Sequence, residues 1–301
     1  MIRKPFRVML YILFSITILG GCAKPTEIVT LPPPTDSPTQ STSSSNVTPE
    51  VIPFQATVGG LLVAGHCTGT HSPGIPVVVL QSGNGADDMQ LAGIEHHMAD
   101  RTMVCSWSRP SAGRSETPEN LPRPISAVVA EMHDVLTALE VAPPYFPIGQ
   151  SAGGAVVFMF AQAYPDEVAG FVSMNPNPPY TRWIEAAAKV ETPAELEDLE
   201  YPDFRGENPE RVVFTGNDGM LEDPLPNAMP YGVMFDENCG GASFCDRILE
   251  PLAAVQALLA DVGDSGRFVW AKGAGHEIYL TQSQLVYDTI DEVWNVAVGG
   301  Q

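Results

Sequence analysis

The sequence has few basic residues. Lys and Arg together number 15, against 36 Asp and Glu in 301 residues, which gives a formal net charge of −21. A protein that binds a nucleic-acid backbone needs stripes of Lys and Arg, and adhesion to anionic lipid needs a polybasic patch. The charge therefore excludes a nucleic-acid binder and argues against electrostatic binding to lipid. It favours a soluble, monomeric body.

The N-terminal apolar run is too short to span a membrane. It covers residues 8–19, follows three basic residues and falls short of the ~20 residues that cross a bilayer. A basic start, a short apolar stretch and small residues at its end are typical of a secretory signal. The ending Leu19-Gly20-Gly21-Cys22 resembles a bacterial lipobox. This resemblance implies a signal peptide over 1–22, with Cys22 lipidated and anchored to the extracytoplasmic face of a bacterial membrane.

Residues 23–53 have little apolar content and are rich in Pro, Ser and Thr. Such a segment cannot bury enough surface to offset the entropy of ordering it, so we expect a disordered linker. Residues 54–301 then form a single domain.

Zinc-type cysteine spacing is also missing. No C-x-x-C or Cys/His pattern of that type occurs, so a metal site has little support. Disulfides fit an exported protein better, and four cysteines besides Cys22 allow three pairings. The segment between Cys239 and Cys245 is short enough to close locally, which favours this pair and leaves Cys67 with Cys105.

Short β-branched runs alternate with segments of helical periodicity. Residues 76–80 and 145–148 read as buried strands, and 125–139 and 152–164 as helices. This alternation predicts an α/β fold with a doubly wound, mostly parallel sheet, whose functional residues collect at the carboxyl ends of the strands. The alternation breaks between about 176 and 230, an acidic stretch that predicts a cap insertion.

A G-x-S-x-G motif, Gly149-Gln150-Ser151-Ala152-Gly153, lies between a predicted strand and a predicted helix. In that context the small residues allow a sharp turn that exposes the Ser hydroxyl above the helix N-terminus. The alternative is a glycine-rich turn whose Ser only caps the helix. We take Ser151 as the candidate nucleophile.

A serine nucleophile needs a base. His276 follows the last predicted strand, 125 residues after Ser151, which is where a triad base belongs. We assign surface or core roles to the other histidines, which are His66, His71, His96, His97 and His133.

The third member should be a carboxylate that lies between Ser151 and His276 and ends the penultimate strand. Strand-like runs end at Asp218 and at Asp236-Glu237. Because the helix after about residue 246 leads directly into the last strand, the run 231–235 should be the penultimate strand. Asp236 is therefore favoured; the remaining alternatives are Glu237 and Asp218, with Asp246 last.

The oxyanion formed by attack on a carbonyl needs preorganised N–H donors. We expect one from the backbone of Ala152, at the helix start. The second should come from Asn84, in the glycine-containing loop 81–85 after the first central strand. The other interpretation of that loop is a plain strand-to-helix turn.

These motifs resemble the α/β-hydrolase family, and in particular its extracytoplasmic branch. Over residues 60–280 they follow the family's order: His66-Cys67-Thr68-Gly69-Thr70, Ser82-Gly83-Asn84-Gly85, the run Ser108–Ser115, the Ser151 elbow and Gly275-His276. The resemblance implies an α/β-hydrolase fold with Ser151 as nucleophile and His276 as base. It also implies Asn84 and Ala152 as oxyanion donors, and Cys67 and Cys105 close enough to bridge.

Two positions depart from the family's pattern. Its oxyanion loop usually begins His-Gly, or Glu-Ala-Gly in this branch, where this chain has Gln81-Ser82-Gly83. An Asp usually precedes Arg109, where this chain has Ser108. These departures bear on loop geometry and substrate fit and leave the reaction class unchanged.

The predicted function is that of a carboxylesterase-like serine hydrolase that acts on a small-molecule acyl substrate outside the cytoplasm and needs no metal or organic cofactor. Tyr180 and Trp183 of the cap should shape the acyl pocket, and its acidity should disfavour anionic substrates. The alternatives are a peptidase, a haloperoxidase- or perhydrolase-like enzyme on the same triad, and a non-catalytic binding lipoprotein.

Overall fold

The computed structural model describes residues 50–189, 210–214, 216–237 and 245–299. The predicted signal peptide, Cys22 and nearly all of the predicted linker lie outside these residues. Cys239 and the side chains of Cys245 and Asp246 also lie outside them, so the predicted Cys239–Cys245 bridge stays a prediction.

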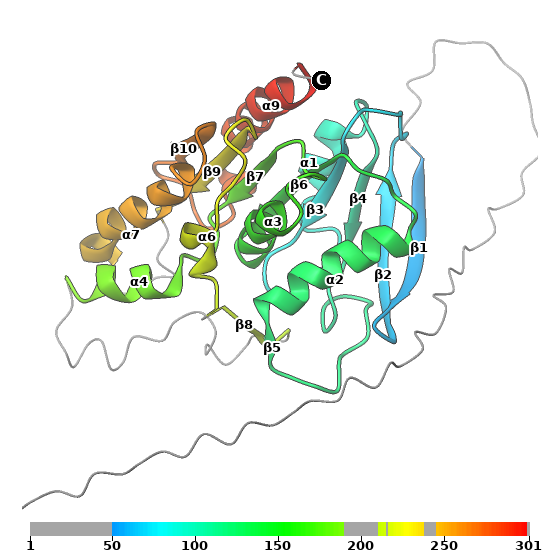
Figure 1. Cartoon of the computed structure of the whole chain (residues 1–301), viewed down its shortest axis with the longest axis horizontal. Helices are drawn as coiled ribbons and strands as arrows, with labels where there is room; N and C mark the ends of the chain where they lie inside the picture. The colour runs from blue at the N-terminus through cyan, green and yellow to red at the C-terminus, as the bar shows by residue number, and fades with distance from the viewer. Residues whose placement is uncertain (1–49, 190–209, 215, 238–244, 300–301) are drawn as a thin grey trace, which may run out of the picture.

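An eight-stranded sheet forms the centre of the fold, in the order β1-β2-β4-β3-β6-β7-β9-β10 (Figure 1). From β4 to β10 all neighbouring strands are parallel, whereas β2 runs antiparallel to both β1 and β4. The strands are β1 (Val51–Val58), β2 (Leu61–Thr68), β3 (Val77–Gln81), β4 (Val104–Trp107), β6 (Tyr145–Gln150), β7 (Phe171–Met174), β9 (Tyr231–Phe235) and β10 (Gly266–Trp270).

Helices cover both faces of this sheet (Figure 1). They are α1 (Ala92–Met98), α2 (Ile125–Ala138), α3 (Ala152–Ala163), α4 (Tyr180–Ala187), α6 (Gly219–Glu222), α7 (Cys245–Ala260), α8 (Ile278–Thr281) and α9 (Ser283–Gly299). Successive side chains of a strand point to opposite faces. Accordingly Val77 and Val79 of β3 join the core cluster that contains α2 and α3, and Val78 and Leu80 join the cluster that contains α1 and α9. The doubly wound α/β prediction is confirmed.

One local prediction differs from the structure. Strand β1 begins at Val51, before the expected start of the domain at residue 54. Cys67 lies inside β2, and a turn follows at Gly69. Helix α1 begins at Ala92, because the residues before it form the turns of the loop after β3.

The insertion between β7 and β9 contains described elements on both sides of residues 190–209. On the first side is α4, and on the second are β8 (Val212–Val213) and α6. β8 pairs with β5 (Arg123–Pro124) in a separate two-stranded sheet, so β8 belongs to the insertion rather than to the main sheet. Trp183 is buried and joins the main core, and Tyr180 packs against it. Across the described ranges, no helix has the length and apolar character of a membrane span.

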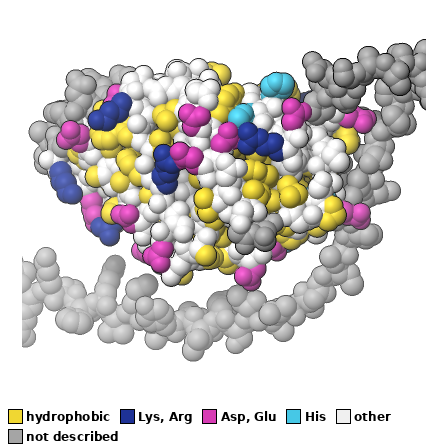
Figure 2. All heavy atoms as spheres, turned by 90° about the horizontal axis from the view of Figure 1, so that it is seen from above, with side chains coloured by type: hydrophobic (Ala, Val, Ile, Leu, Met, Phe, Trp, Pro, Cys, Tyr) yellow, Lys and Arg dark blue, Asp and Glu magenta, His cyan; other side chains and the backbone are white. Residues whose placement is uncertain are grey.

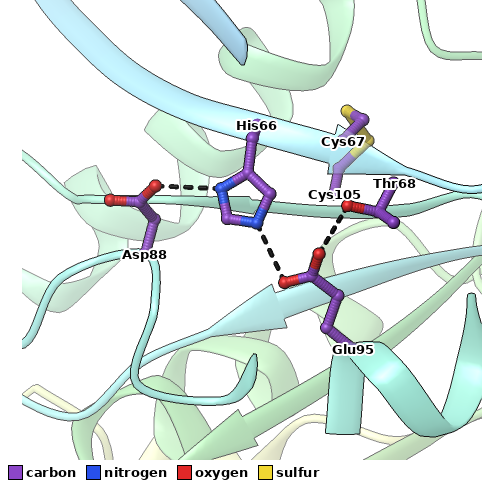
Figure 3. Close-up of a disulfide and its surroundings, with 6 residues drawn as sticks. All are labelled: His66, Cys67, Thr68, Asp88, Glu95 and Cys105. Carbon is purple, nitrogen blue, oxygen red and sulfur yellow. Dashed lines mark hydrogen bonds and ion pairs between the residues drawn. A yellow bond between two sulfur atoms is a disulfide. The ribbon is translucent and has the colours of Figure 1, made fainter. Parts of the chain in front are cut away.

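A disulfide joins Cys67 of β2 to Cys105 of β4, as the resemblance implies. The two residues are register partners on neighbouring antiparallel strands, with their Cα atoms 4.1 Å apart (Figure 3). The bond therefore ties the antiparallel edge of the sheet to its parallel centre.

Candidate active site

Ser151 occupies a strained turn between β6 and α3. Its φ of 55° and ψ of −118° lie in a region that costs a non-glycine residue about 1–3 kcal/mol. The turn is held by the backbone N–H of Ser151, which donates to the carbonyl of Met174 at the end of β7, 2.8 Å away. The Ser151 side chain therefore stands at the carboxyl edge of the sheet.

The glycines of the motif are required by close backbone contacts. A Cβ atom on Gly149 would lie 2.2 Å from the carbonyl oxygen of Gly153, and one on Gly153 would lie 2.1 Å from the carbonyl oxygen of Gln81. Real Cβ atoms do not approach so closely, so only glycine fits both positions. The second contact also shows that the start of α3 packs directly against the loop after β3.

His276 and Asp236 meet at the same edge. Asp236 follows β9 and is 1% exposed, and His276 lies in the loop after β10. Nδ1 of His276 is 3.1 Å from Oδ2 of Asp236. The hydrogen bond to Asp236 raises the pKa of His276 against the opposing effect of burial.

The alternative carboxylates are engaged elsewhere. Glu237 accepts a hydrogen bond from the backbone N–H of Gly273 at 2.7 Å. Asp218 accepts from the backbone N–H and the hydroxyl of Thr181, at 2.8 and 2.6 Å, and so fixes the start of α4. Asp236, the carboxylate favoured from the sequence, is thus also the one that lies next to His276 in the structure.

The Ser151 hydroxyl and the His276 ring share an edge of the sheet without a direct hydrogen bond between them in the structure. Gln150, next to Ser151, donates from Nε2 to the carbonyl of His276 at 3.3 Å, which links the two loops. A nucleophile–base contact often tightens only when substrate is bound.

Asn175 is a polar residue of this site that we did not single out from the sequence. It follows β7 with a φ of 45°, and its backbone N–H donates to the carbonyl of Met234 at 2.7 Å. Its Nδ2 lies 3.0 Å from Oδ2 of Asp236 and 2.9 Å from Nδ1 of His276. The available signal was a polar residue directly after a buried parallel strand, where functional residues collect.

The two predicted oxyanion donors have no acceptor in the described part of the chain. Around Asn84, the N–H of Gly83 donates to Oε1 of Gln90 and the N–H of Gly85 donates to Oε1 of Glu210, each at 2.6 Å. The Asn84 N–H between them has no recorded partner. The N–H of Ala152, at the start of α3, has none either. Since the loop packs against α3, both groups are available at neighbouring positions.

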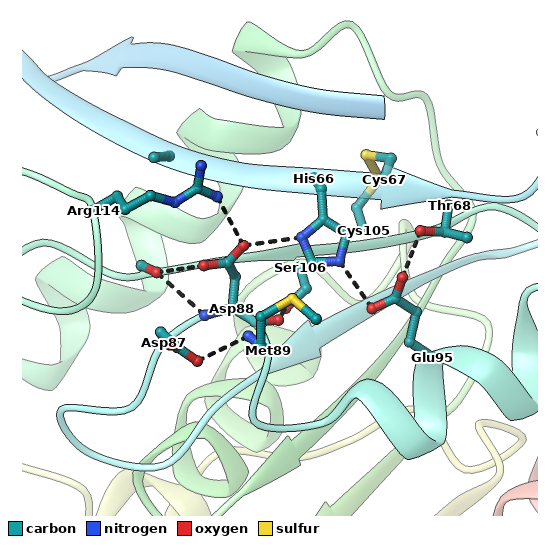
Figure 4. A network of polar contacts seen from close by, with 12 residues as sticks. His66, Cys67, Thr68, Asp87, Asp88, Met89, Glu95, Cys105, Ser106 and Arg114 are labelled. Atoms are coloured by element: carbon teal, nitrogen blue, oxygen red, sulfur yellow. Dashed lines mark hydrogen bonds and ion pairs between the residues drawn. A yellow bond between two sulfur atoms is a disulfide. The ribbon is translucent and has the colours of Figure 1, made fainter. Parts of the chain in front are cut away.

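His66 belongs to a separate buried network on β2 (Figure 3, Figure 4). Its Nδ1 lies 2.9 Å from Asp88 and its Nε2 2.9 Å from Glu95. The hydroxyl of Thr68 donates to Glu95, and Arg114 donates to Asp88 at 3.2 Å. The Glu95 hydrogen bond raises the pKa of His66, in spite of burial. His66 is thus buried and paired, which agrees with the core role assigned to it.

The comparisons agree with this architecture. The sequence model of a family described as "alpha/beta hydrolase fold" matches residues 75–213. A thermophilic esterase from Thermogutta terrifontis is 19% identical, with 82% of this chain and 99% of that chain covered and a TM-score of 0.55. A 2-hydroxy-6-oxo-6-phenylhexa-2,4-dienoate hydrolase from a Rhodococcus species is 18% identical, with coverages of 82% and 100% and a TM-score of 0.56.

An alpha/beta hydrolase from a deep-sea metagenome library of the Medee basin is 14% identical, with coverages of 82% and 97% and a TM-score of 0.59. Identities this low establish the fold alone. No curated protein sequence matches the chain. The chain is an α/β-hydrolase-fold protein.

Proposed function

We propose that the chain is a serine hydrolase that cleaves an ester or a related acyl bond, with Ser151 as nucleophile, His276 as base and Asp236 as the acid of the triad. The observation that carries the proposal is the 3.1 Å contact between His276 and Asp236 at the sheet edge that holds the strained Ser151 turn. The N–H groups of Asn84 and Ala152, which have no acceptor among the described residues, supply the oxyanion donors.

The proposed reaction follows from this arrangement. Asp236 accepts from Nδ1 of His276, which leaves Nε2 as the nitrogen that takes the proton of the Ser151 hydroxyl. The Ser151 oxygen attacks the acyl carbon, and the N–H groups of Asn84 and Ala152 donate to the resulting oxyanion. His276 then gives its proton to the leaving group. Water activated by His276 hydrolyses the acyl-enzyme and releases the acid.

The substrate class that we propose is a neutral ester. An esterase among the structural neighbours supports ester chemistry, and the acidic insertion over residues 176–230 would repel an anionic acyl group. A panel of neutral, cationic and anionic p-nitrophenyl esters tests this assignment. Higher kcat/KM for the anionic esters would contradict it.

We also propose that the protein is exported and anchored through lipid on Cys22. The lipobox-like ending at Cys22 and the disulfide between Cys67 and Cys105 support this location, because disulfides persist in oxidising compartments. Metabolic labelling with a fatty acid should mark the full chain and leave Cys22→Ser unlabelled. Equal labelling of both would contradict the anchor.

A fluorophosphonate probe tests the nucleophile. The full chain, expressed with its N-terminal segment and extracted in detergent, should acquire one adduct, which peptide mapping should locate on Ser151. Ser151→Ala should acquire none while keeping the melting temperature within a few degrees. An unlabelled but well-folded chain would overturn the proposal and favour a non-catalytic binding protein.

A further inference from the structure

Arg109 and Glu210 form a buried ion pair that the proposed reaction does not use. Their side chains are 3% and 0% exposed. Nε of Arg109 donates to Oε2 of Glu210 at 2.7 Å, and Nη2 donates to Oε1 at 2.7 Å. This two-bond geometry requires the planar guanidinium, and a lysine cannot reproduce it.

The same pair holds the backbone on both sides of Asn84. Arg109 donates from Nη1 to the carbonyl of Ser82 at 2.7 Å and from Nη2 to the carbonyl of Gly83 at 2.9 Å. Beyond Asn84, the N–H of Gly85 donates to Oε1 of Glu210 at 2.6 Å. The ion pair therefore fixes the backbone on either side of the Asn84 N–H, which has no acceptor among the residues that the structure describes.

General stability does not account for such an arrangement. Burying two charges is costly, and well-packed apolar residues often replace a buried ion pair at no loss of stability. An ion pair that bonds to three consecutive peptide groups of one loop instead fixes the orientation of that loop. Glu210 also comes from the far side of the insertion between β7 and β9, so the insertion contributes a side chain to the loop after β3.

We propose that Arg109 and Glu210 are positioning residues of the oxyanion hole, which hold the Asn84 N–H toward the acyl oxygen in the transition state. The inference rests on the proposed function, since it assigns a task to the same site. Because the oxyanion exists only after attack, correct orientation of this donor lowers the barrier with little effect on substrate binding. The expected signature is thus a loss of kcat at nearly constant KM.

The test compares Glu210→Gln and Arg109→Lys with the full unsubstituted chain. In Glu210→Gln the new amide nitrogen faces a donor of Arg109, which breaks the pair while keeping the size of the side chain. Asp291→Asn is the control, because Asp291 is also an acid paired with an arginine, Arg101, at 2.6 Å, but lies in α9 rather than in the insertion. All rates are divided by the number of sites titrated with fluorophosphonate, so a variant that folds only in part still gives a result.

With p-nitrophenyl butyrate, kcat per titrated site should fall about 10- to 100-fold in both variants. This decrease does not exceed the one caused by removing an oxyanion donor altogether. KM should change by less than about threefold. Affinity for phenylboronic acid, which forms a tetrahedral adduct on the serine, should fall by the same factor as kcat/KM. Asp291→Asn should retain the unsubstituted values.

Unchanged kcat per titrated site in Glu210→Gln and Arg109→Lys would overturn the inference and leave the proposed function intact. A loss in Asp291→Asn equal to that in Glu210→Gln would also overturn it, because the effect would then follow from the loss of any paired acid. Absence of both hydrolysis and Ser151 labelling in the unsubstituted chain would overturn the proposed function and this inference together.

Discussion

The side-chain amide of Asn175 donates to the same oxygen of Asp236 that faces His276. Nδ2 of Asn175 is 3.0 Å from Oδ2 of Asp236 and 2.9 Å from Nδ1 of His276, so the three groups converge on one point at the ends of β7, β9 and β10. The amide thus helps to fix the orientation of the buried Asp236 carboxylate.

Replacing Asn175 should therefore weaken the proposed triad without removing a member of it. In Asn175→Ala the loss of a hydrogen bond to a charged group, about 1.5–3 kcal/mol, should lower kcat/KM about tenfold or somewhat more. Steady-state hydrolysis of p-nitrophenyl butyrate measures this. Activity equal to that of the unsubstituted chain would contradict the role of Asn175.

The same geometry predicts that a carboxylate at position 175 can replace the one at position 236. Asp236→Asn should lose most of the activity, and adding Asn175→Asp should recover at least about tenfold of it, because the new carboxylate would stand where Nδ2 now lies 2.9 Å from His276. Aspartate tolerates the positive φ of this position nearly as well as asparagine. If the double variant is no more active than Asp236→Asn, this prediction is wrong.

The pH profile should reflect the raised pKa of His276. A general base must be neutral, so kcat/KM should fall as pH decreases through this pKa, with a midpoint above the ordinary value of 6.5. The hydrogen bond to Asp236 is the main cause of the shift, so Asp236→Asn should move the midpoint of its residual activity to lower pH. A midpoint that stays in place in the variant would contradict the assignment.

The buried network around His66 should make stability depend on pH in both directions. The pKa of His66 is raised, so its contribution is complete below the ordinary 6.5 and disappears as pH rises through the folded-state pKa. Burial alone would raise the pKa values of Asp88 and Glu95, but the hydrogen bonds from His66, with Ser108 and Thr68, hold them below 3.8 and 4.5. Their contribution disappears as pH falls through those lowered values.

The contribution of this network to the melting temperature should thus be greatest between about pH 4.5 and 6.5 and should decrease at lower and at higher pH. In His66→Gln the decrease in melting temperature that this network causes at higher pH should disappear. Arg114, which pairs with Asp88 and is more than half exposed, offers a control, since Arg114→Gln should leave that decrease in place. Identical pH curves for His66→Gln and the unsubstituted chain would contradict the network's role.

Loss of the disulfide should lower stability and spare the chemistry. The bond between Cys67 and Cys105 closes a loop with a sequence separation of 38, for which a contribution of about 2–4 kcal/mol to the free energy of unfolding is typical. Reduction of the bond should lower the melting temperature, while kcat per fluorophosphonate-titrated site stays within about twofold. A reduced chain with unchanged melting temperature would contradict this.

Chain order and strand ends were sufficient to predict part of the site. Ser151 and His276 carry local signals, a glycine-rich elbow and a loop after the last strand, and Asp236 follows from the order of the strands. Asn175 and Glu210 carry no comparable signal. They lie 61 residues from Asp236 and 101 residues from Arg109, respectively, so their roles depend on contacts that only the folded chain creates. An acid such as Glu210 looks in the sequence like any other acid of the insertion.

Strand β1 carries a sequence signal in the alternation of its apolar residues Phe54, Ala56 and Val58 with polar ones. Residues 51–58 alternate between exposed and buried toward the end of β1, the pattern of a strand with one solvated face. In the sequence this short alternation directly adjoins the Pro-, Ser- and Thr-rich segment. Register with β2, and with it the position of Cys67, follows only from the antiparallel pairing.

The direction of β1 determines at which edge of the sheet the N-terminal segment joins the body. β1 runs in the same sense as the parallel strands, since it and β4 are both antiparallel to β2, and Val51 pairs with Thr68, which in turn pairs with the first residue of β4. The body thus begins at the amino ends of the strands, four positions across the sheet and roughly 19 Å from β6. If the chain is anchored through Cys22 as proposed, the tether would join the body at the edge of the sheet opposite to the one that carries Ser151.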